Sequence, residues 1–294
     1  GYKASTVPGT VSGLLLAHAQ FGKLPLAVVI APAIVQAING INVSFDLEQA
    51  IASAPQLSWD DESRGIYFKD GKPLQEGSVM QRPDLAKTMT LISENGSKGF
   101  YEGEVAKKIV ESMSDNGGSI TIEDLQNYKA RFSQPIGVNY RGYKVYTHGP
   151  PSGGGIVLLT ALNVLEYFDL GQIGNNSALT YHLLAESLRR GHNNRSHHVG
   201  DPSFYNVPYD DLMSDRRIRE FAKSVTLKKA SSAAVIKPLE IIQESKNTTH
   251  YSIVDGDGNA VSNTYTLGYS FGSGVTIPGT GILMNNQMNN FAYQ

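Results

Sequence analysis

The sequence around residue 250 most narrows the choice of folds, because it reads as a β-hairpin. Two β-rich runs, 248–254 and 260–267, flank the turn Asp255-Gly-Asp-Gly-Asn259. An Asp-Gly turn between runs of β-forming residues is the strongest short-range hairpin signal. Most of the chain before it has apolar residues at helical spacing. A chain that is helix-rich first and strand-rich last favours an α+β fold over alternating parallel-sheet units.

The upstream helices are predicted from apolar spacing and end signals. Thr10 is expected to cap a helix over Val11–Phe21, which Gly22 stops. Leu26–Ala37 is apolar on nearly all sides, so we expect that helix to be buried. Ser58–Gly77 is rich in turn residues and predicts a loop or a small hairpin. The other expected helices are 46–54, 83–95, 100–116, 121–128 (opened by a Thr-x-x-Asp capping box), 156–167, 177–190 and 230–235; the other expected strands are a hairpin in 135–147, 272–275 and 279–283.

Composition excludes several classes of function. The chain has 294 residues, which suits one large domain or two small ones. A formal net charge of −2 gives no electrostatic attraction to nucleic acid. The absence of cysteine removes disulfides and thiolate chemistry. The longest apolar run, Leu24–Ile38, is too short to span a membrane and contains two prolines.

No pattern predicts a cofactor or a metal ion. Gly153-Gly-Gly155 precedes a helix but lacks the spacing of nucleotide-binding loops, so we expect close backbone packing there. The Asp255–Asn259 turn departs from a calcium loop, since Ala260 replaces the glycine at position six and Thr266 the glutamate at position twelve. Three histidines have no zinc-site spacing and are expected in a surface loop: His192, His197 and His198.

Thr248 opens the hairpin and is a candidate nucleophile. Cleavage of the Asn247–Thr248 bond would free an α-amine beside the Thr248 hydroxyl. That amine has a reference pKa of about 7.7–8.0, which suits a general base near neutral pH. Thr266 lies on the return strand, where register could bring it to Thr248. The alternative for both threonines is an ordinary strand position, which β-branched residues favour.

The amide run 285–290, Asn-Asn-Gln-Met-Asn-Asn, is a second candidate binding element. Amides supply hydrogen-bond donors and acceptors without charge, as a pocket for a polar substrate requires. The same run would also suit a surface loop.

Together these segments resemble the γ-glutamyltransferase (γ-glutamyl transpeptidase) family of N-terminal-nucleophile hydrolases. The block from Thr248-Thr-His-Tyr to Asn286-Gln-Met is the most specific part of the resemblance, which extends over nearly the whole chain. The other matching segments are Gly9–Gly13, Leu24–Ala27, Ala31–Ile34, Gly149–Gly154, Gly200–Pro202, Asp257–Asn259, Thr264–Thr266, Phe271–Gly274 and Gly281–Leu283.

The resemblance implies a precursor that cleaves itself between Asn247 and Thr248. Residues 1–247 would be part of the large subunit and 248–294 the start of the small subunit, within one structural domain. The implied fold is a four-layer αββα sandwich with the new N-terminus on a central strand. Thr248 would be the nucleophile, Thr266 its support, and Gln287 a contact of the donor's α-amino group.

Two positions depart from the family pattern. Asn290 stands where an acidic residue binds the donor's ammonium group, and Gly268 stands where an asparagine commonly helps. Both changes weaken recognition of an ammonium and favour a glutaryl-like acyl group. The resemblance also implies further segments, with a carboxylate-binding arginine before Gly1 and oxyanion glycines and a lid after Gln294.

Three functions follow from this sequence. The first is γ-glutamyl transfer or hydrolysis through a Thr248 acyl-enzyme, with a small-molecule donor such as glutathione and an amino acid, peptide or water as acceptor. The second is a cephalosporin acylase-like amidase for glutaryl amides. The third is an inactive, uncleaved precursor with a structural role. The resemblance implies an extracytoplasmic location.

Overall fold

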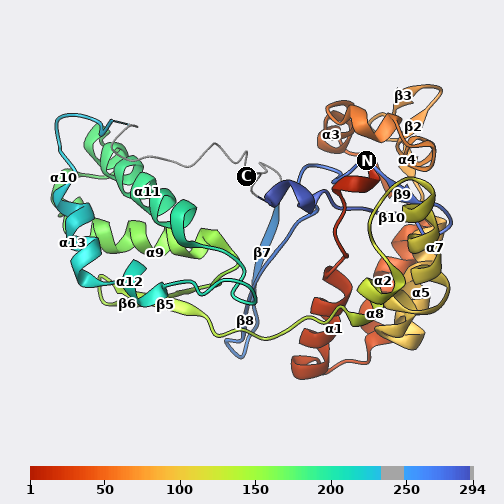
Figure 1. The fold of residues 1–294 in the computed structure, drawn as a ribbon. Coiled ribbons are helices and arrows are strands. Elements are labelled where there is room, and N and C mark those ends of the chain that lie inside the picture. Colours follow the sequence, from red (N-terminus) through yellow and green to blue (C-terminus); the bar gives the residue numbers. More distant parts are fainter. Residues whose placement is uncertain (233–247, 292–294) are drawn as a thin grey trace. The chain divides into compact units, whose positions relative to one another are not determined.

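The structure is a computed structural model that describes residues 1–232 and 248–291. Two compact units divide these residues: unit 1 contains 1–131 and 248–291, and unit 2 contains 132–232 (Figure 1). The expectation that both belong to one structural domain stays a prediction. Asn247 lies outside the described residues, as does most of the helix expected at 230–235.

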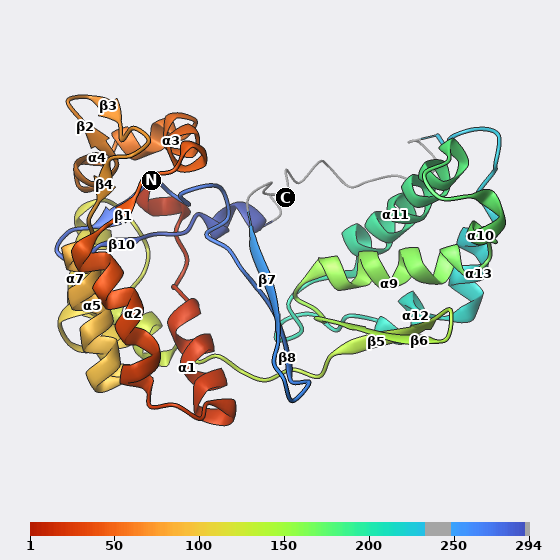
Figure 2. The same cartoon turned by 180° about the vertical axis from the view of Figure 1, so that it is seen from behind.

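Unit 1 contains helices and short antiparallel strand pairs, followed by a long hairpin (Figures 1 and 2). Its strands pair as β1 with β4, β2 with β3, β7 with β8 and β9 with β10. The elements are η1 (Tyr2–Ala4), α1 (Thr10–Phe21), α2 (Leu26–Asn39), β1 (Ile41–Asn42), α3 (Phe45–Ala52), η2 (Pro55–Ser58), α4 (Asp61–Tyr67), β2 (Phe68–Lys69), β3 (Lys72–Pro73), β4 (Val79–Met80), α5 (Pro83–Asn95), α6 (Lys98–Tyr101), α7 (Gly103–Asp115), α8 (Ile122–Asn127), β7 (Thr249–Val254), β8 (Ala260–Tyr265), β9 (Thr276–Ile277), β10 (Ile282–Leu283) and η3 (Gln287–Asn290).

Helix α1 ends at Gly22 as predicted, but its capping was predicted wrongly. Thr10 is the first helical residue, and the N-cap residue, Gly9, has no side chain to accept a bond. The hydroxyl of Tyr101 accepts from the backbone N–H of Ser12 at 3.1 Å instead. A side chain remote in sequence therefore takes over the role of the N-cap.

Helix α2 is exposed, so the prediction that it is buried was wrong. It packs against α5 (Figures 1 and 2) and Ile30 reaches the core. Val28 and Val35, however, are each 53% exposed. An apolar helix is buried only when neighbours cover all its faces, and the described residues cover one side of α2.

In the middle of unit 1, the elements follow largely from capping and turn residues close together in the sequence. Helix α5 has the predicted bounds, and Thr121 and Asp124 form the predicted capping box. The single helix predicted at 100–116 is divided between α6, which ends at Tyr101, and α7, which begins at Gly103 with φ +66° and ends at Asp115. In the predicted loop 58–77, the helix α4 was missed, although Asp60 caps it by accepting from the Ser63 N–H at 2.9 Å; the β2–β3 hairpin follows, as one alternative predicted.

Two apolar clusters form the core of unit 1. The larger joins α5, α6, α7 and α8 to the β9–β10 pair, and the smaller joins α3, η2, α4 and β4 with Val43 and Leu74. The central side chains are completely buried: Ile109, Met113, Leu125, Ile277 and Met284 in the larger cluster, and Ile51 and Leu57 in the smaller. The β9–β10 pair therefore anchors the segment that leads into η3.

Unit 2 combines a hairpin with a pair of packed helices, α9 and α11 (Figure 1). Its described elements are β5 (Ile136–Tyr140), β6 (Tyr143–Thr147), α9 (Gly153–Leu165), α10 (Leu170–Ile173), α11 (Ala178–His198), α12 (Tyr209–Leu212) and α13 (Asp215–Lys223). The hairpin predicted in 135–147 is present as β5 and β6, with its turn at Arg141-Gly142. A Cβ on Gly155 would lie 2.1 Å from the carbonyl oxygen of His148, which confirms the close packing expected there.

Helix α11 is longer than predicted. Ser177, predicted as its first residue, is its N-cap, and the helix continues through His198, so the three histidines predicted in a loop belong to a helix. Its apolar face ends near Leu188, and beyond that point polar residues still face neighbours. Asn194, for example, is completely buried, donates to Thr160 Oγ1 and accepts from Arg217 Nε. The apolar spacing alone therefore placed the end too early.

The hairpin of β7 and β8 forms with the predicted turn. Asp255 Oδ1 accepts the N–H groups of Asp257 and Asn259 at 3.0 and 2.8 Å, as in a turn between strands. Every residue of β7 is exposed, and β8 is nearly so. The predicted strands 272–275 and 279–283 were placed imprecisely, since β9 begins at Thr276 and β10 covers two residues.

Candidate active site

Thr248 stands directly before β7, opposite Thr266. The register pairs Thr249 with Tyr265, so the next pair outward is Thr248 with Thr266. The Thr248 hydroxyl donates to the Thr266 hydroxyl with an Oγ1–Oγ1 distance of 3.3 Å. The approach that the sequence suggested for these two threonines is therefore present in the structure.

Thr266 is in turn held by the bend that follows β8. Its Oγ1 accepts from the Gly268 N–H at 2.9 Å and lies 3.3 Å from the Gly268 carbonyl oxygen. The hydroxyl of Thr266 thus joins the start of β7 to the loop after β8, and the loop restricts its orientation.

His250 lies on the same face of the hairpin as Thr248, because alternate residues of a strand share a face. Its Nδ1 is 2.6 Å from Thr264 Oγ1, and its Nε2 is 3.3 Å from the hydroxyls of Ser252 and Ser262. This face is therefore a row of hydroxyl groups with one imidazole among them. No sequence pattern assigned a role to His250, although its spacing of two from Thr248 is the signal that could have placed it on this face.

Gly268 occupies a position that favours glycine. Its φ is +95°, a left-handed conformation that L side chains rarely adopt. A Cβ on Gly268 would lie 1.9 Å from Asn286 Oδ1. That oxygen accepts from the Tyr269 N–H at 2.9 Å, and the Asn286 N–H donates to the Leu267 carbonyl at 2.8 Å. Asn286 therefore fills the space beside Gly268.

Gln287 and Asn290 complete the cluster from η3. The amide Nε2 of Gln287 donates to the Thr266 carbonyl oxygen at 3.4 Å. Asn290 Nδ2 donates to Gln287 Oε1. The structure thus links all the predicted site residues that it describes in one chain of contacts: Thr248, Thr266, Gly268, Gln287 and Asn290. These side chains are uncharged, so hydrogen bonds rather than ion pairs would select a ligand here.

The amide run is not a uniform surface loop. Asn285 and Asn286 are each 6% exposed, whereas Asn289 and Asn290 are exposed. The buried pair braces the loop, and the exposed pair is free to meet solvent or a ligand. The sequence could not separate these two roles.

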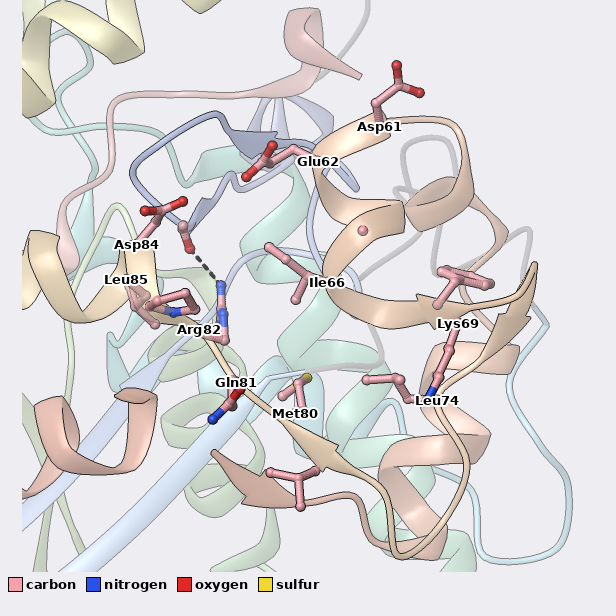
Figure 3. Close-up of a pocket in the computed structure, with 15 residues that line it drawn as sticks. Asp61, Glu62, Ile66, Lys69, Leu74, Met80, Gln81, Arg82, Asp84 and Leu85 are labelled. Atoms are coloured by element: carbon pink, nitrogen blue, oxygen red, sulfur yellow. Dashed lines mark hydrogen bonds between the residues drawn. The ribbon is translucent and has the colours of Figure 1, made fainter. Parts of the chain in front are cut away.

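A cavity of about 500 Å³ lies elsewhere in unit 1 (Figure 3). It is bounded by α4, the β2–β3 hairpin, β4 and the start of α5, with Ile66, Leu74 and Met80 supplying apolar surface. Arg82 crosses it to donate to the Gly281 carbonyl at 2.6 Å. Neither Thr248 nor Thr266 lines this cavity, so it is separate from the candidate site.

The described residues contain neither a cluster of metal-ligating side chains nor a helix suited to a membrane. No cluster of three or more His, Cys, Asp or Glu side chains there could hold a metal ion. In the same residues, no helix combines the length and the apolar character that crossing a bilayer requires.

Comparison with known proteins identifies the family. The family model described as gamma-glutamyltranspeptidase matches residues 1–294. The glutathione hydrolase proenzyme of Escherichia coli (strain K12) is 41% identical over 292 residues, which cover 98% of this chain and 50% of that protein. The chain spans about half the length of the curated relatives it matches.

Solved structures agree with the sequence comparison. The crystal structure of Helicobacter pylori gamma-glutamyltranspeptidase superimposes with a TM-score of 0.78 at 36% identity, covering 84% of this chain and 72% of that one. Cephalosporin acylase from Bacillus halodurans superimposes with a TM-score of 0.86 at 30% identity, covering 99% of this chain and 53% of that one. The fold, with its mixed helices and strands, is that of these N-terminal-nucleophile hydrolases, and the chain belongs to the gamma-glutamyltranspeptidase family.

Proposed function

We propose that the protein cleaves itself between Asn247 and Thr248 and then transfers or hydrolyses γ-glutamyl groups through a Thr248 acyl-enzyme. The observation that carries the proposal is the hydrogen bond from Thr248 Oγ1 to Thr266 Oγ1 at 3.3 Å, in a chain of this family. The Escherichia coli relative, named a glutathione hydrolase proenzyme, supports a glutathione-type donor and a precursor.

The cleavage step uses the Thr248 hydroxyl as an internal nucleophile. Its oxygen attacks the carbonyl carbon of residue 247, the C–N bond breaks, and the nitrogen takes the hydroxyl proton. Water then hydrolyses the resulting ester. The products are a carboxylate on residue 247 and a free α-amine on Thr248, which regains its hydroxyl.

Catalysis repeats the attack on a substrate. The new α-amine accepts the Thr248 hydroxyl proton as Oγ1 attacks the γ-carbonyl of the donor, and it returns that proton to the departing amine. The acyl group is then an ester on Thr248, which water or an amino acceptor releases. Thr266, fixed by the Gly268 N–H, would hold Oγ1 in the orientation for attack.

Donor recognition would fall to Gln287 and Asn290 beside Gly268. An amide oxygen at Asn290 can accept from an ammonium but carries no charge, so the ion pair that a carboxylate would form is lost, at a cost of roughly 1.5–3 kcal/mol. This favours one alternative specifically, a glutaryl-amide amidase, whose substrate lacks the ammonium. The similarity to cephalosporin acylase supports keeping it as the second candidate.

In the whole protein, residues 1–247 would contribute to the large subunit and residues 248–294 to the small subunit. Both subunits would belong to a single four-layer αββα domain, in which further strands cover β7 and β8. We infer an extracytoplasmic location, with an amino acid, a peptide or water as acceptor. The competing view, an uncleaved precursor with only a structural role, predicts one intact polypeptide.

Replacing the nucleophile tests the proposal. Thr248→Ala should abolish both chain cleavage and turnover of γ-glutamyl anilide. Thr249→Ala is the matched control, because Thr249 is its neighbour on the opposite face, and it should be cleaved normally. N-terminal sequencing of the smaller wild-type fragment should begin at Thr248. Cleavage of the Thr248→Ala variant would overturn the mechanism.

A further inference from the structure

The N-terminal segment of unit 1 is bound to the loop that carries Gln287. Ser5 is 1% exposed, and its hydroxyl lies 3.4 Å from the hydroxyl of Ser273. The next residue, Thr6, meets Asn285, whose sequence position is 279 residues away. Two consecutive residues at the start of the chain therefore contact the segment just before η3.

Asn285 makes these contacts through both ends of its amide. Its Oδ1 accepts from the Thr6 N–H at 3.0 Å and lies 3.1 Å from the Thr6 hydroxyl. Its Nδ2 donates to the Thr6 carbonyl oxygen at 2.8 Å. The side chain thus pairs with the backbone of Thr6 as a neighbouring strand would. Asn285 itself is only 6% exposed, so leaving its amide without partners would be costly.

The same oxygen also holds Gln287. The backbone N–H of Gln287 donates to Asn285 Oδ1 at 3.0 Å. The side chain of Gln287 has a longer contact, 3.4 Å from Nε2 to the Thr266 carbonyl. A shift of Thr6 would consequently move the Asn285 amide and, with it, the backbone that orients the Gln287 side chain.

We propose that Asn285 is a positioning residue that couples the Ser5–Thr6 segment to Gln287 and so sets the geometry of donor binding. The inference rests on the proposed role of Gln287 in contacting the donor. Because Thr6 precedes the proposed cleavage site and Asn285 follows it, cleavage makes this a contact between subunits. Donor affinity then depends on the correct position of the large subunit's N-terminal segment against Asn285.

Asn285→Asp tests the coupling, because it keeps the shape of the side chain and changes the Nδ2 donor into an acceptor that faces the Thr6 carbonyl. We expect KM for γ-glutamyl anilide to rise about tenfold while kcat changes less than threefold, as for a residue that acts on binding. Chain cleavage should proceed.

Two matched variants separate coupling from general damage. Asn116 Nδ2 also donates to a backbone carbonyl, that of Ser112 in a helix, at 2.9 Å. Asn116→Asp therefore makes the same chemical change outside the proposed coupling and should leave KM unaltered. Thr6→Val removes the hydroxyl but keeps both backbone bonds, and should raise KM less than twofold. Equal KM values for Asn285→Asp and Asn116→Asp, or a loss of kcat at constant KM, would overturn the proposal. If Asn285→Asp does not fold, the uncharged Asn285→Ser, too short to bond both partners, carries the same KM prediction.

Hydrogen exchange tests the coupling without any substrate. In Asn285→Ala, the amide protons of both Thr6 and Gln287 should exchange faster than in the wild type, since both lose their acceptor. If the wild-type protein does not turn over γ-glutamyl substrates, the proposed function is refuted, but the hydrogen-exchange comparison still tests the coupling. Unchanged exchange at the two sites would refute the coupling itself.

Discussion

Glu186 and Arg190 form a buried ion pair one turn apart on α11, with Arg190 Nη1 2.6 Å from Glu186 Oε2. Glu186 also accepts from the backbone N–H of Ser231 at 3.0 Å and from its hydroxyl. Arg189 adds a second guanidinium at 3.1 Å and donates to the Ser231 carbonyl at 2.8 Å. The pair therefore fixes Ser231, which is remote from α11 in sequence.

Glu186 should make the protein sensitive to acid. Burial alone would raise the pKa of its carboxyl, but hydrogen bonds from Ser231 and Arg190 outweigh burial and lower the pKa to about 2. Because the folded pKa lies below the ordinary value of 4.5, the stabilisation is complete above pH 4.5 and is lost as the pH falls through 2. The shift corresponds to about 3 kcal/mol at most.

Urea unfolding of Glu186→Gln from pH 7 to pH 2 measures this contribution. At pH 7 the variant should lose up to about 3 kcal/mol of unfolding free energy, and the two proteins should converge at the acid end. Glu220→Gln, which removes an exposed partner of Arg216, is the control and should cost under about 1 kcal/mol. A constant difference across the pH range would contradict the assignment.

Thr266→Val should lower kcat by roughly 10–100-fold, because the methyl group cannot accept the bond from Thr248 or from the Gly268 N–H. Thr266→Ser retains the hydroxyl and should keep most of the activity. Steady-state turnover of γ-glutamyl anilide by the cleaved proteins is the measurement. Equal kcat for the valine and serine variants would remove Thr266 from the mechanism.

Gly268→Ala should destabilise unit 1 by about 2 kcal/mol or more, from the left-handed φ and from the displacement of Asn286. Thermal melting measures the loss. Gly256→Ala, where no atom lies within 4 Å of the new Cβ, is the control. The double variant Gly268→Ala/Asn286→Gly lacks the steric clash, so it should recover the stability lost to that clash and keep the loss caused by the left-handed φ. A Gly268→Ala variant that melts at the wild-type temperature would contradict the prediction, because the loop would then accommodate the new Cβ.

Asn290→Asp should shift specificity toward donors with a free ammonium. Restoring a charge should raise the ratio of kcat/KM for γ-glutamyl over glutaryl anilide by about 10–100-fold, the equivalent of one charge-assisted bond. Asn289→Asp places the same charge one residue earlier and should change the ratio far less. Equal ratios for the two aspartate variants would indicate a general charge effect rather than contact with the donor.

The parts of the fold that the sequence predicted correctly depend on neighbours in the chain. The capping box at Thr121 and the turn at Asp255 are formed by residues within four positions of each other. The parts that it missed depend on distant partners. No local pattern could show that Tyr101 takes the cap of α1, or that α2 is left with an uncovered side.

The candidate site follows the same division. The pairing of Thr248 with Thr266 could be inferred, because a short turn fixes the register between them. The reason for glycine at position 268 could not be inferred, since a Cβ there would clash with the side-chain amide oxygen of Asn286. Likewise, Asn285 gains its significance from Thr6, at the other end of the chain.

The uncovered hairpin has a practical consequence for handling these residues in isolation. Ile253 and Val261 form a cross-strand pair and are 57% and 53% exposed, and in the described residues β7 and β8 pair only with each other. Free strand edges beside apolar side chains are templates for adding further strands from other molecules. A preparation of residues 1–294 alone should consequently precipitate or gel as its concentration rises. A charged substitution at Ile253 should keep the protein in solution.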